Sequence, residues 1–461
     1  MTALSETKKY QAYPEYKDSG VEWLEEVPSD WDVIKIKHLS PVKRGASPRP
    51  IDDPKYFDKE GEYAWVRIAD VSASKTYLET TTQTMSELGS SLSVKLEPNQ
   101  LFLSIAGTVG KPCINKIKAC IHDGFVYFPD LKIPNKYLFY VFAGEQAYKG
   151  LGKMGTQLNL NTDTVGDIKV ALPREHGHIE QIVHFLDHET AKIDTLIEKQ
   201  QQLIKLLKEK RQAVISHAVT KGLNPQAPMK NSGVEWLGEV PEHWVVAQLK
   251  FNTKLMQTGP FGSQLHAEDY VEGGVPLINP AHMINGEIVP DPQVSVDADT
   301  QERLSRHKLS EGDIIFARRG ELGRCAVVTD QQVGWICGTG SLKATLNERL
   351  IPEYAYLLIT SDGVVAELSL ESKGSTMDNL NTETLGKIRT PVPPVHEQRA
   401  ILAYVDEVSG KYKQLVDMAE NAIGLMKERR TALISAAVTG KIDVRNWQAP
   451  TSQNQALEQT A

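Results

Sequence analysis

The chain of 461 residues contains the same series of segments twice, and this duplication constrains the fold more than any other feature. KDSGVEWLEEVPSDW begins at Lys17 and KNSGVEWLGEVPEHW at Lys230, with eleven of the fifteen positions identical. NLNTDTVGDIKVALP begins at Asn159, and NLNTETLGKIRTPVP begins at Asn379. Each half therefore has the same order of parts: a leading segment, a variable region, an exit segment and a long helix.

The last repeated segment predicts a long helix in each half. IVHFLDHETAKIDTLIEKQQQLIKLLKEKRQAVISHAVT begins at Ile182, and ILAYVDEVSGKYKQLVDMAENAIGLMKERRTALISAAVT begins at Ile401. Neither contains proline, and apolar residues recur at seven-residue spacing, with Leu196, Leu203 and Leu415 in the predicted seams. Such a stripe suits a coiled-coil partner. We expect the two helices to pair with each other in antiparallel fashion, and the alternative is burial of each in an unrelated bundle.

The two variable regions share a glycine turn and little else. LFLSIAGTVGKPCI begins at Leu101 and IIFARRGELGRCAVV at Ile314, and in both, short β-rich runs flank the turn. The residues that match at an offset of 213 are Gly107 with Gly320, Gly110 with Gly323, and Lys111 with Arg324. The shared turn and the divergent remainder indicate two modules that have the same fold and recognise two different ligands.

The charge of the chain and of its two variable regions does not identify these ligands. The formal net charge of −8 argues mildly against nucleic acid, because phosphate binding needs local positive charge. From Trp31 to Pro173, 18 Lys and Arg stand against 15 Asp and Glu, whereas from Trp244 to Pro393 the numbers are 13 and 19. A DNA-binding face on the second region would have to be a local patch.

The sequence also favours a cytoplasmic protein without a metal or cofactor. The first twenty residues lack the apolar core of a secretory signal, and no apolar run approaches the ~18 residues of a membrane span. Cys113, Cys120, Cys325 and Cys337 have no C-x-x-C spacing, so we interpret them as reduced thiols rather than zinc ligands.

The repeated order of GVEWL-x-EVP-x-x-W, LNT-x-T-x-G-x-I and a helix ending in A-V-T resembles the specificity subunit of type I restriction–modification systems, often called HsdS. The resemblance covers residues from about Lys17 to about Asp443. It implies an α+β fold with two mixed α/β target-recognition domains, separated by two long antiparallel coiled-coil helices and related by pseudo-twofold symmetry. It implies recognition of a two-part double-stranded DNA target, without chemistry of its own. The implied partners are two methyltransferase subunits and, for cleavage, restriction/translocase subunits.

On this interpretation the chain divides into seven parts. They are a leading segment (1–30), a first recognition domain (31–173), a first long helix (174–222), a linker with the repeated leading segment (223–243), a second recognition domain (244–393), a second long helix (394–443) and a disordered tail (444–461). The first leading segment has no helix before it, so we expect it to pack beside the end of the second helix. Trp23 and Trp31, with their counterparts Trp236 and Trp244, would be equivalent apolar anchors.

Candidate DNA-contacting residues lie in loops of both variable regions. Arginine can bind guanine edges or phosphates, and glycine lets a backbone approach a phosphate closely. The candidates are Lys43, Arg44, Arg49 and Lys111 in the first region, and Ser263, Gln264, Arg318, Arg319 and Arg324 in the second. For each of them the alternative is a solvated charge or a turn residue.

Two rival functions remain at this point. One is a coiled-coil scaffold that binds protein partners only. The other is a fused DNA methylase or nuclease, which would need catalytic residues. Asp53-Pro54-Lys55-Tyr56 has one proline where an adenine methylase motif has two, so we expect a turn there. No phosphate-binding loop of the G-x-x-x-x-G-K-[ST] type is present, and we expect no catalytic residues.

Overall fold

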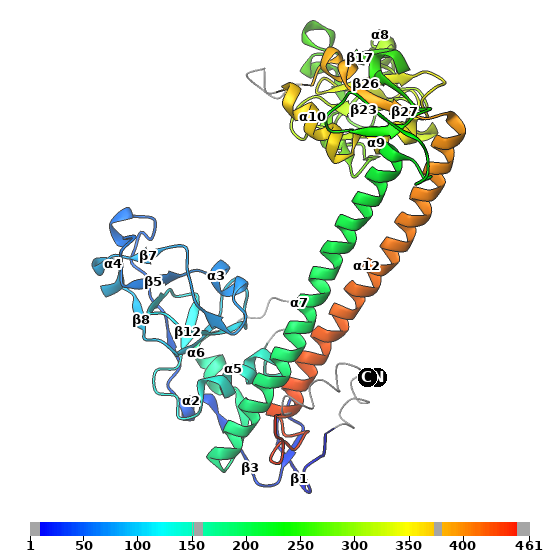
Figure 1. The fold of residues 1–461 in the computed structure, drawn as a ribbon. Helices are drawn as coiled ribbons and strands as arrows, with labels where there is room; N and C mark the ends of the chain where they lie inside the picture. The colour runs from blue at the N-terminus through cyan, green and yellow to red at the C-terminus, as the bar shows by residue number, and fades with distance from the viewer. Residues whose placement is uncertain (1–9, 150, 152–159, 373–379, 450–461) are drawn as a thin grey trace. The chain divides into compact units, whose positions relative to one another are not determined.

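The computed structural model describes residues 10–149, 151, 160–372 and 380–449 (Figure 1). They form two compact units, one drawn from residues 1–201 and 420–461 and the other from residues 202–419. Unit 1 contains residues 31–173, which we call module 1, and unit 2 contains residues 244–393, which we call module 2. Asn159 and Asn379, at the start of the exit segments, lie outside the described residues. Within the described ranges, no helix is long and apolar enough to cross a membrane.

Module 1 is built on two small sheets. The five-stranded sheet has the order β4 (Lys43–Arg44), β12 (Phe125–Tyr127), β9 (Leu101–Ser104), β10 (Pro112–Asn115) and β6 (Tyr77–Leu78). The four-stranded sheet has the order β7 (Thr84–Met85), β5 (Tyr63–Val66), β11 (Ala119–Ile121) and β8 (Val94–Leu96). All pairs are antiparallel except β10 with β6 and β11 with β5. Strands β9 and β11 are buried along their whole length, as their apolar sequences require.

Short helices surround these sheets. They are α2 (Ile36–Leu39), η2 (Pro54–Tyr56), α3 (Ile68–Ala73), α4 (Glu87–Ser91), α5 (Asn135–Ala143), η3 (Gln146–Tyr148) and α6 (Thr162–Asp167). The Asp53-Pro54-Lys55-Tyr56 stretch forms η2, where the Asp53 carboxylate accepts a hydrogen bond from the Lys55 amide. It is the turn that the sequence predicted.

Module 2 repeats this plan. One sheet has the order β17 (Thr253–Thr258), β26 (Ser341–Leu346), β23 (Ile314–Ala317) and β24 (Cys325–Val327), and the other β18 (Tyr270–Val271), β22 (Ser295–Val296), β19 (Val275–Ile278) and β25 (Ile336–Cys337). A hairpin joins β20 (Met283–Ile284) and β21 (Glu287–Ile288). The helices are η4 (Leu249–Asn252), η5 (Gly262–Gln264), η6 (Ala267–Asp269), η7 (Pro280–His282), α8 (Ala298–Arg303), η8 (Ser305–His307), η9 (Asp330–Gln332), α9 (Pro352–Ile359), α10 (Asp362–Ser372) and α11 (Thr382–Lys387). The mixed helix and strand content of both modules confirms the expected class.

Each module closes on itself where it joins the helices. β3 (Trp31–Lys35) pairs antiparallel with β13 (Lys169–Pro173), so the first and last residues of module 1 lie opposite each other. β16 (Val245–Gln248) pairs in the same way with β27 (Arg389–Val392) in module 2. Each module is therefore inserted into the helical frame through one two-stranded ribbon.

The two long helices are α7 (His176–Lys221) and α12 (Val395–Val438) (Figure 1). In unit 1 the start of α7 shares a core with the end of α12, through Ile182, Leu186 and Ile434 among others. Asp194 and Arg430 form an ion pair of 2.9 Å there. In unit 2 the end of α7 shares a core with the start of α12. The helices therefore run in opposite directions within each unit.

The predicted seam is only partly buried. Ile193 and Ile197 are buried, but Leu196, Leu203 and Leu415, which the sevenfold repeat placed in the seam, are 42%, 43% and 47% exposed. An α-helix has 3.6 residues per turn rather than 3.5, so a strict seven-residue count drifts around the helix. The prediction was wrong for these three leucines.

The leading segments form matching hairpins, β1 (Tyr16–Asp18) with β2 (Glu26–Pro28) and β14 (Met229–Asn231) with β15 (Glu239–Pro241). In unit 1 the Tyr16 hydroxyl donates a 3.0 Å hydrogen bond to the carbonyl of Gly440, just beyond α12. A Cβ on Gly440 would clash with Pro28, and the φ of this residue is +72°. The first leading segment therefore packs beside the end of the second helix, as predicted.

The tryptophans of the leading segments differ in burial. Trp31 and Trp244 are fully buried, whereas Trp23 and Trp236 are half-buried. The indole Nε1 of Trp244 donates a 2.9 Å hydrogen bond to Glu397 at the start of α12. Trp236 lies against Gly363, where a Cβ would overlap its ring. Trp31 and Trp244 are therefore equally buried in their respective units, and so are Trp23 and Trp236.

The chain continues in ordered form beyond α12. Val444 is buried, and Trp447 makes an edge-to-face contact with Phe185 at a centroid distance of 5.3 Å. The Tyr13 ring lies 4.9 Å from the Arg445 guanidinium. The expectation of disorder from Val444 is therefore wrong for residues 444–449, because their apolar side chains have a core to join; residues 450–461 lie outside the described residues.

Candidate nucleic-acid interface

Four loops meet at one edge of module 1, which we call loop edge 1. They are residues 45–50 after β4, residues 67–74 after β5 (a connection that contains the short helix α3), residues 105–111 between β9 and β10, and residues 122–124 between β11 and β12. The amide of Ala46 donates a 3.1 Å hydrogen bond to Ile121, and the amide of Ile105 donates one of 2.8 Å to Gly124. The Lys111 ammonium donates one of 2.7 Å to the carbonyl of Ser72. These bonds connect all four loops.

Module 2 has the corresponding loop edge 2, formed by residues 259–264, 279–282, 318–324 and 338–340. The amide of Arg318 donates a 2.9 Å hydrogen bond to Gly340, which matches the bond from Ile105 to Gly124. Arg324 Nη1 donates one of 3.4 Å to the carbonyl of Pro280, as Lys111 does to Ser72. The same backbone frame therefore supports both edges, although their sequences differ.

Glycine is required at two kinds of position in this frame. A Cβ on Gly45 would overlap the carbonyl oxygen of His122, and one on Gly259 would overlap that of Gly338. Each glycine lets the loop after β4 or β17 pass directly over the neighbouring loop. The turn glycines of both edges, which the repeat predicted, all have positive φ: Gly107 +64°, Gly110 +86°, Gly320 +85° and Gly323 +83°.

Lys111 and Arg324, both predicted to contact DNA, also make hydrogen bonds within their own modules. Besides its bond to Ser72, Lys111 is partly buried, and this burial lowers the pKa of its ammonium group. Arg324 forms an ion pair of 2.7 Å with Glu321 in addition to its bond to Pro280. Equivalent positions thus make equivalent hydrogen bonds, which connect the glycine turn to the neighbouring segment in each module.

Two of the other basic candidates of module 1 contact Asp123. Arg44 Nε donates a 2.5 Å hydrogen bond to the carbonyl of Asp123, and Arg49 lies 3.3 Å from its carboxylate. Lys43 is exposed on β4 beside them. Three exposed cations therefore lie on and beside loop edge 1, and two of them contact Asp123. Sequence reasoning missed Asp123, because its approach to these arginines depends on the pairing of β4 with β12.

The candidates of module 2 have different environments. Arg318 is half-buried, and its Nε donates a 3.3 Å hydrogen bond to the carbonyl of Leu380. Arg319 is exposed, and among the described residues no hydrogen bond or ion pair involves its side chain. Ser263 and Gln264 are exposed in η5, where Gln264 Oε1 accepts a 3.1 Å hydrogen bond from the Phe261 amide. Of the cations described at this edge, Arg319 is the one whose side chain makes no hydrogen bond or ion pair with a described residue.

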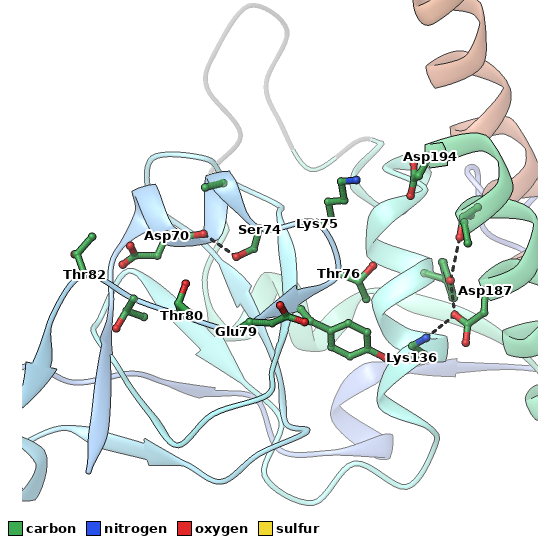
Figure 2. Close-up of a pocket in the computed structure, with 16 residues that line it drawn as sticks. Asp70, Ser74, Lys75, Thr76, Glu79, Thr80, Thr82, Lys136, Asp187 and Asp194 are labelled. Carbon is green, nitrogen blue, oxygen red and sulfur yellow. Dashed lines mark hydrogen bonds and ion pairs between the residues drawn. The ribbon is translucent and has the colours of Figure 1, made fainter. Parts of the chain in front are cut away.

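A cavity of about 710 Å³ lies in unit 1, between the segment 70–82, which overlaps loop edge 1 at residues 70–74, and helices α5 and α7 (Figure 2). Its lining contains two lysines, Lys75 and Lys136, and four carboxylates, Asp70, Glu79, Asp187 and Asp194. Lys136 is already paired with Asp187 at 2.6 Å. An acidic lining repels phosphate, so this cavity is a poor site for nucleic acid.

The cysteines lie apart from one another. Cys113, Cys120, Cys325 and Cys337 are buried in four different apolar clusters. Burial raises the pKa of Cys113, Cys120 and Cys337 to about 12. Within the described ranges, no group of three or more His, Cys, Asp and Glu side chains is placed so that it could hold a metal ion.

Comparison with known sequences gives the family. Residues 28–206 and 242–415 match the type I restriction modification DNA specificity domain. The MjaVIII specificity subunit of a type I restriction enzyme from Methanocaldococcus jannaschii is 22% identical over 440 residues, covering 91% of this chain and 95% of the relative. The EcoKI specificity subunit from Escherichia coli K12 is 24% identical over 274 residues, covering 58% of this chain and 56% of the relative.

A solved structure shares the fold. A chain from work on complex assembly and conformational transition of the type I R-M system aligns with a TM-score of 0.63 and 15% identity, covering 90% of this chain and 99% of that one. The two ranges that match the family span most of the sequence, and each contains one whole module. The chain belongs to the family of type I restriction–modification DNA specificity domains.

Proposed function

We propose that this chain is the DNA-reading subunit of a type I restriction–modification complex, with each module reading one half of a two-part target through its loop edge. The observation that carries the proposal is the pair of loop edges, which share a backbone frame and differ in the side chains that they present. Such an arrangement suits two readers of different sequences. Catalysis belongs to the other subunits, two methyltransferases and the restriction/translocase subunits, and the complex acts on DNA in the cytoplasm.

The charges of loop edge 1 support phosphate binding. Arg49 is exposed on this edge, and Lys43 and Arg44 are exposed on the adjoining β4; among the described acidic residues, Asp123 is the one in contact with this group. Cations that replace the counterions of phosphates supply affinity and fix the orientation of a protein on the duplex, while contacts to base edges supply specificity. Loop edge 1 therefore binds its half-site with a strong dependence on salt.

The long helices act as the spacer between the half-sites, as an antiparallel coiled coil with pseudo-twofold symmetry. Equivalent contacts at the helix ends support this symmetry. Gly440 lies against Trp31 and Pro28, and Gly222 lies against Trp244 and Pro241. Two equivalent frames imply two equivalent docking surfaces, one for each methyltransferase subunit. Exposed leucines on the helices, such as Leu206 and Leu425, offer apolar surface for such partners.

A module exchange tests the function. Residues 244–393 are replaced by a second copy of residues 31–173, and the variant is reconstituted with its methyltransferase subunits. Because both modules join the frame through the same two-stranded ribbon, the variant should fold. It should methylate a symmetric target made of two copies of the first half-site, as read from a random-sequence DNA library. Methylation of the original two-part target by a folded variant would contradict the proposal.

A further inference from the structure

Loop edge 2 carries an exposed phenyl ring. Phe261 is 65% exposed at the tip of the loop that follows β17, between Gly259-Pro260 and Gly262. Nothing lies within 4 Å of a Cβ built on Gly262, so the loop projects into open space. Covering a largely exposed aromatic ring with a ligand is favourable, since apolar surface is then removed from water.

The loop that carries the ring is held in place. Gln264 Oε1 accepts the amide hydrogen of Phe261, and the carbonyl of Gln264 accepts a 2.7 Å hydrogen bond from Arg303. Arg303 is itself fixed by an ion pair of 2.6 Å with Asp269. A braced loop loses little conformational entropy on binding, so the exposed ring is presented in a form ready to make a contact.

The chemistry of loop edge 2 favours a base over the phosphate backbone. Module 2 has six more acidic than basic residues, and Arg319 is the exposed cation of this edge without a partner among the described residues. A phenyl ring has no hydrogen bond to offer to a phosphate. In the major groove the C5-methyl group of thymine is the apolar feature that distinguishes one base pair from another, and phenylalanine contacts it.

We propose that Phe261 contacts the C5-methyl group of a thymine in the half-site that module 2 reads, and so sets specificity at that base pair. The inference rests on the proposed function. The contact belongs to module 2 alone, because Ser47 stands two residues after Gly45 in loop edge 1, where Phe261 stands two residues after Gly259. The two modules thus read their half-sites by different chemistry, one mainly through cations and the other through an apolar ring.

The test uses the full chain in complex with its methyltransferase subunits and synthetic duplexes of the methylated target. Each thymine of the second half-site is replaced in turn by uracil, which lacks only the C5-methyl group. The wild-type complex should lose roughly fourfold in affinity at one position, the fold-change expected for one buried methyl group. The Phe261→Ala complex should bind the thymine duplex more weakly and should no longer distinguish thymine from uracil there.

Phe251→Ala is the matched control. Phe251 is 63% exposed in the same module but precedes β17, at the end opposite to Phe261. This variant should keep the preference for thymine, and both variants should melt as the wild type does. A second half-site without thymine, equal binding of thymine and uracil by the wild type, or an unchanged preference in Phe261→Ala would overturn the inference. Failure of the wild-type complex to prefer its target over a scrambled duplex would instead overturn the proposed function.

Discussion

The hydroxyl of Tyr354 donates a 2.8 Å hydrogen bond to the carbonyl oxygen of Val219, in the last turn of α7. In unit 1, the corresponding Tyr137 hydroxyl lies 2.7 Å from the carbonyl oxygen of Ala171 and 3.3 Å from that of Val438 in the last turn of α12, and these two acceptors share its one hydrogen. All these side chains are buried. The last carbonyls of a helix have no partner within the helix, so each tyrosine satisfies a group that would otherwise be left unpaired in a core. Each module is thus joined to a helix end by a buried hydrogen bond.

Tyr354→Phe should therefore destabilise unit 2. The ring still fills its site, but the Val219 carbonyl is left unsatisfied, which costs about 1–3 kcal/mol. Tyr356→Phe is the control, because no hydrogen bond of its hydroxyl is found among the described residues. Chemical denaturation of both variants measures the difference. Equal stability of the two would show that the Val219 carbonyl finds another partner, such as water.

A buried ion pair in module 2 gives a second prediction. Lys343 lies 3.3 Å from the Asp313 carboxylate, both side chains are buried, and Asp313 also accepts a 2.6 Å hydrogen bond from Thr345. Lys343→Met leaves a buried carboxylate without its cation and should cost about 3–5 kcal/mol in unfolding experiments. Lys308→Met removes the partially exposed ion pair with Glu302 and should cost less than about 1 kcal/mol. A similar loss in both variants would mean that burial does not set the strength of the first pair.

Loop edge 1 gives a prediction about salt. In Lys43→Ala/Arg49→Ala, two exposed cations are lost, and the slope of log affinity against log salt concentration should become shallower by about 2. Lys55→Ala/Lys59→Ala removes two cations from the same module, before β5 and outside the segments that form loop edge 1. Its slope should equal that of the wild type. DNA titrations of the complex at several salt concentrations measure both, and identical slopes for the two variants would place the phosphate contacts elsewhere.

The sequence was sufficient to predict the parts that are duplicated. The paired leading segments, the glycine turns and the two long helices all follow from self-similarity, and Trp31 and Trp244 have the equivalent burial that their spacing predicted. Partners distant in the chain could not be predicted. In the sequence, Lys111 looks like a free cation beside a glycine turn. Its hydrogen-bond acceptor is a backbone carbonyl 39 residues earlier, which the sequence around Lys111 does not reveal. Phe261 was missed because a phenylalanine in a loop gives no sign of whether a core covers it.

The spacing between the half-sites gives the last prediction. If the helix pair sets this spacing, lengthening both helices by about four residues adds about one turn, or ~6 Å. Because Asp194 pairs with Arg430, the position of α12 that faces Gln200 lies near Gly424, and insertions at these two positions keep the helices matched. At ~3.4 Å per base pair, the gap should grow by one or two base pairs. Neither module changes, so each half-site should keep its sequence. Sequencing of the methylated sites in cells that carry the variant decides the matter: an unchanged gap with full activity, or altered bases within a half-site, would show that the helices do not set the spacing.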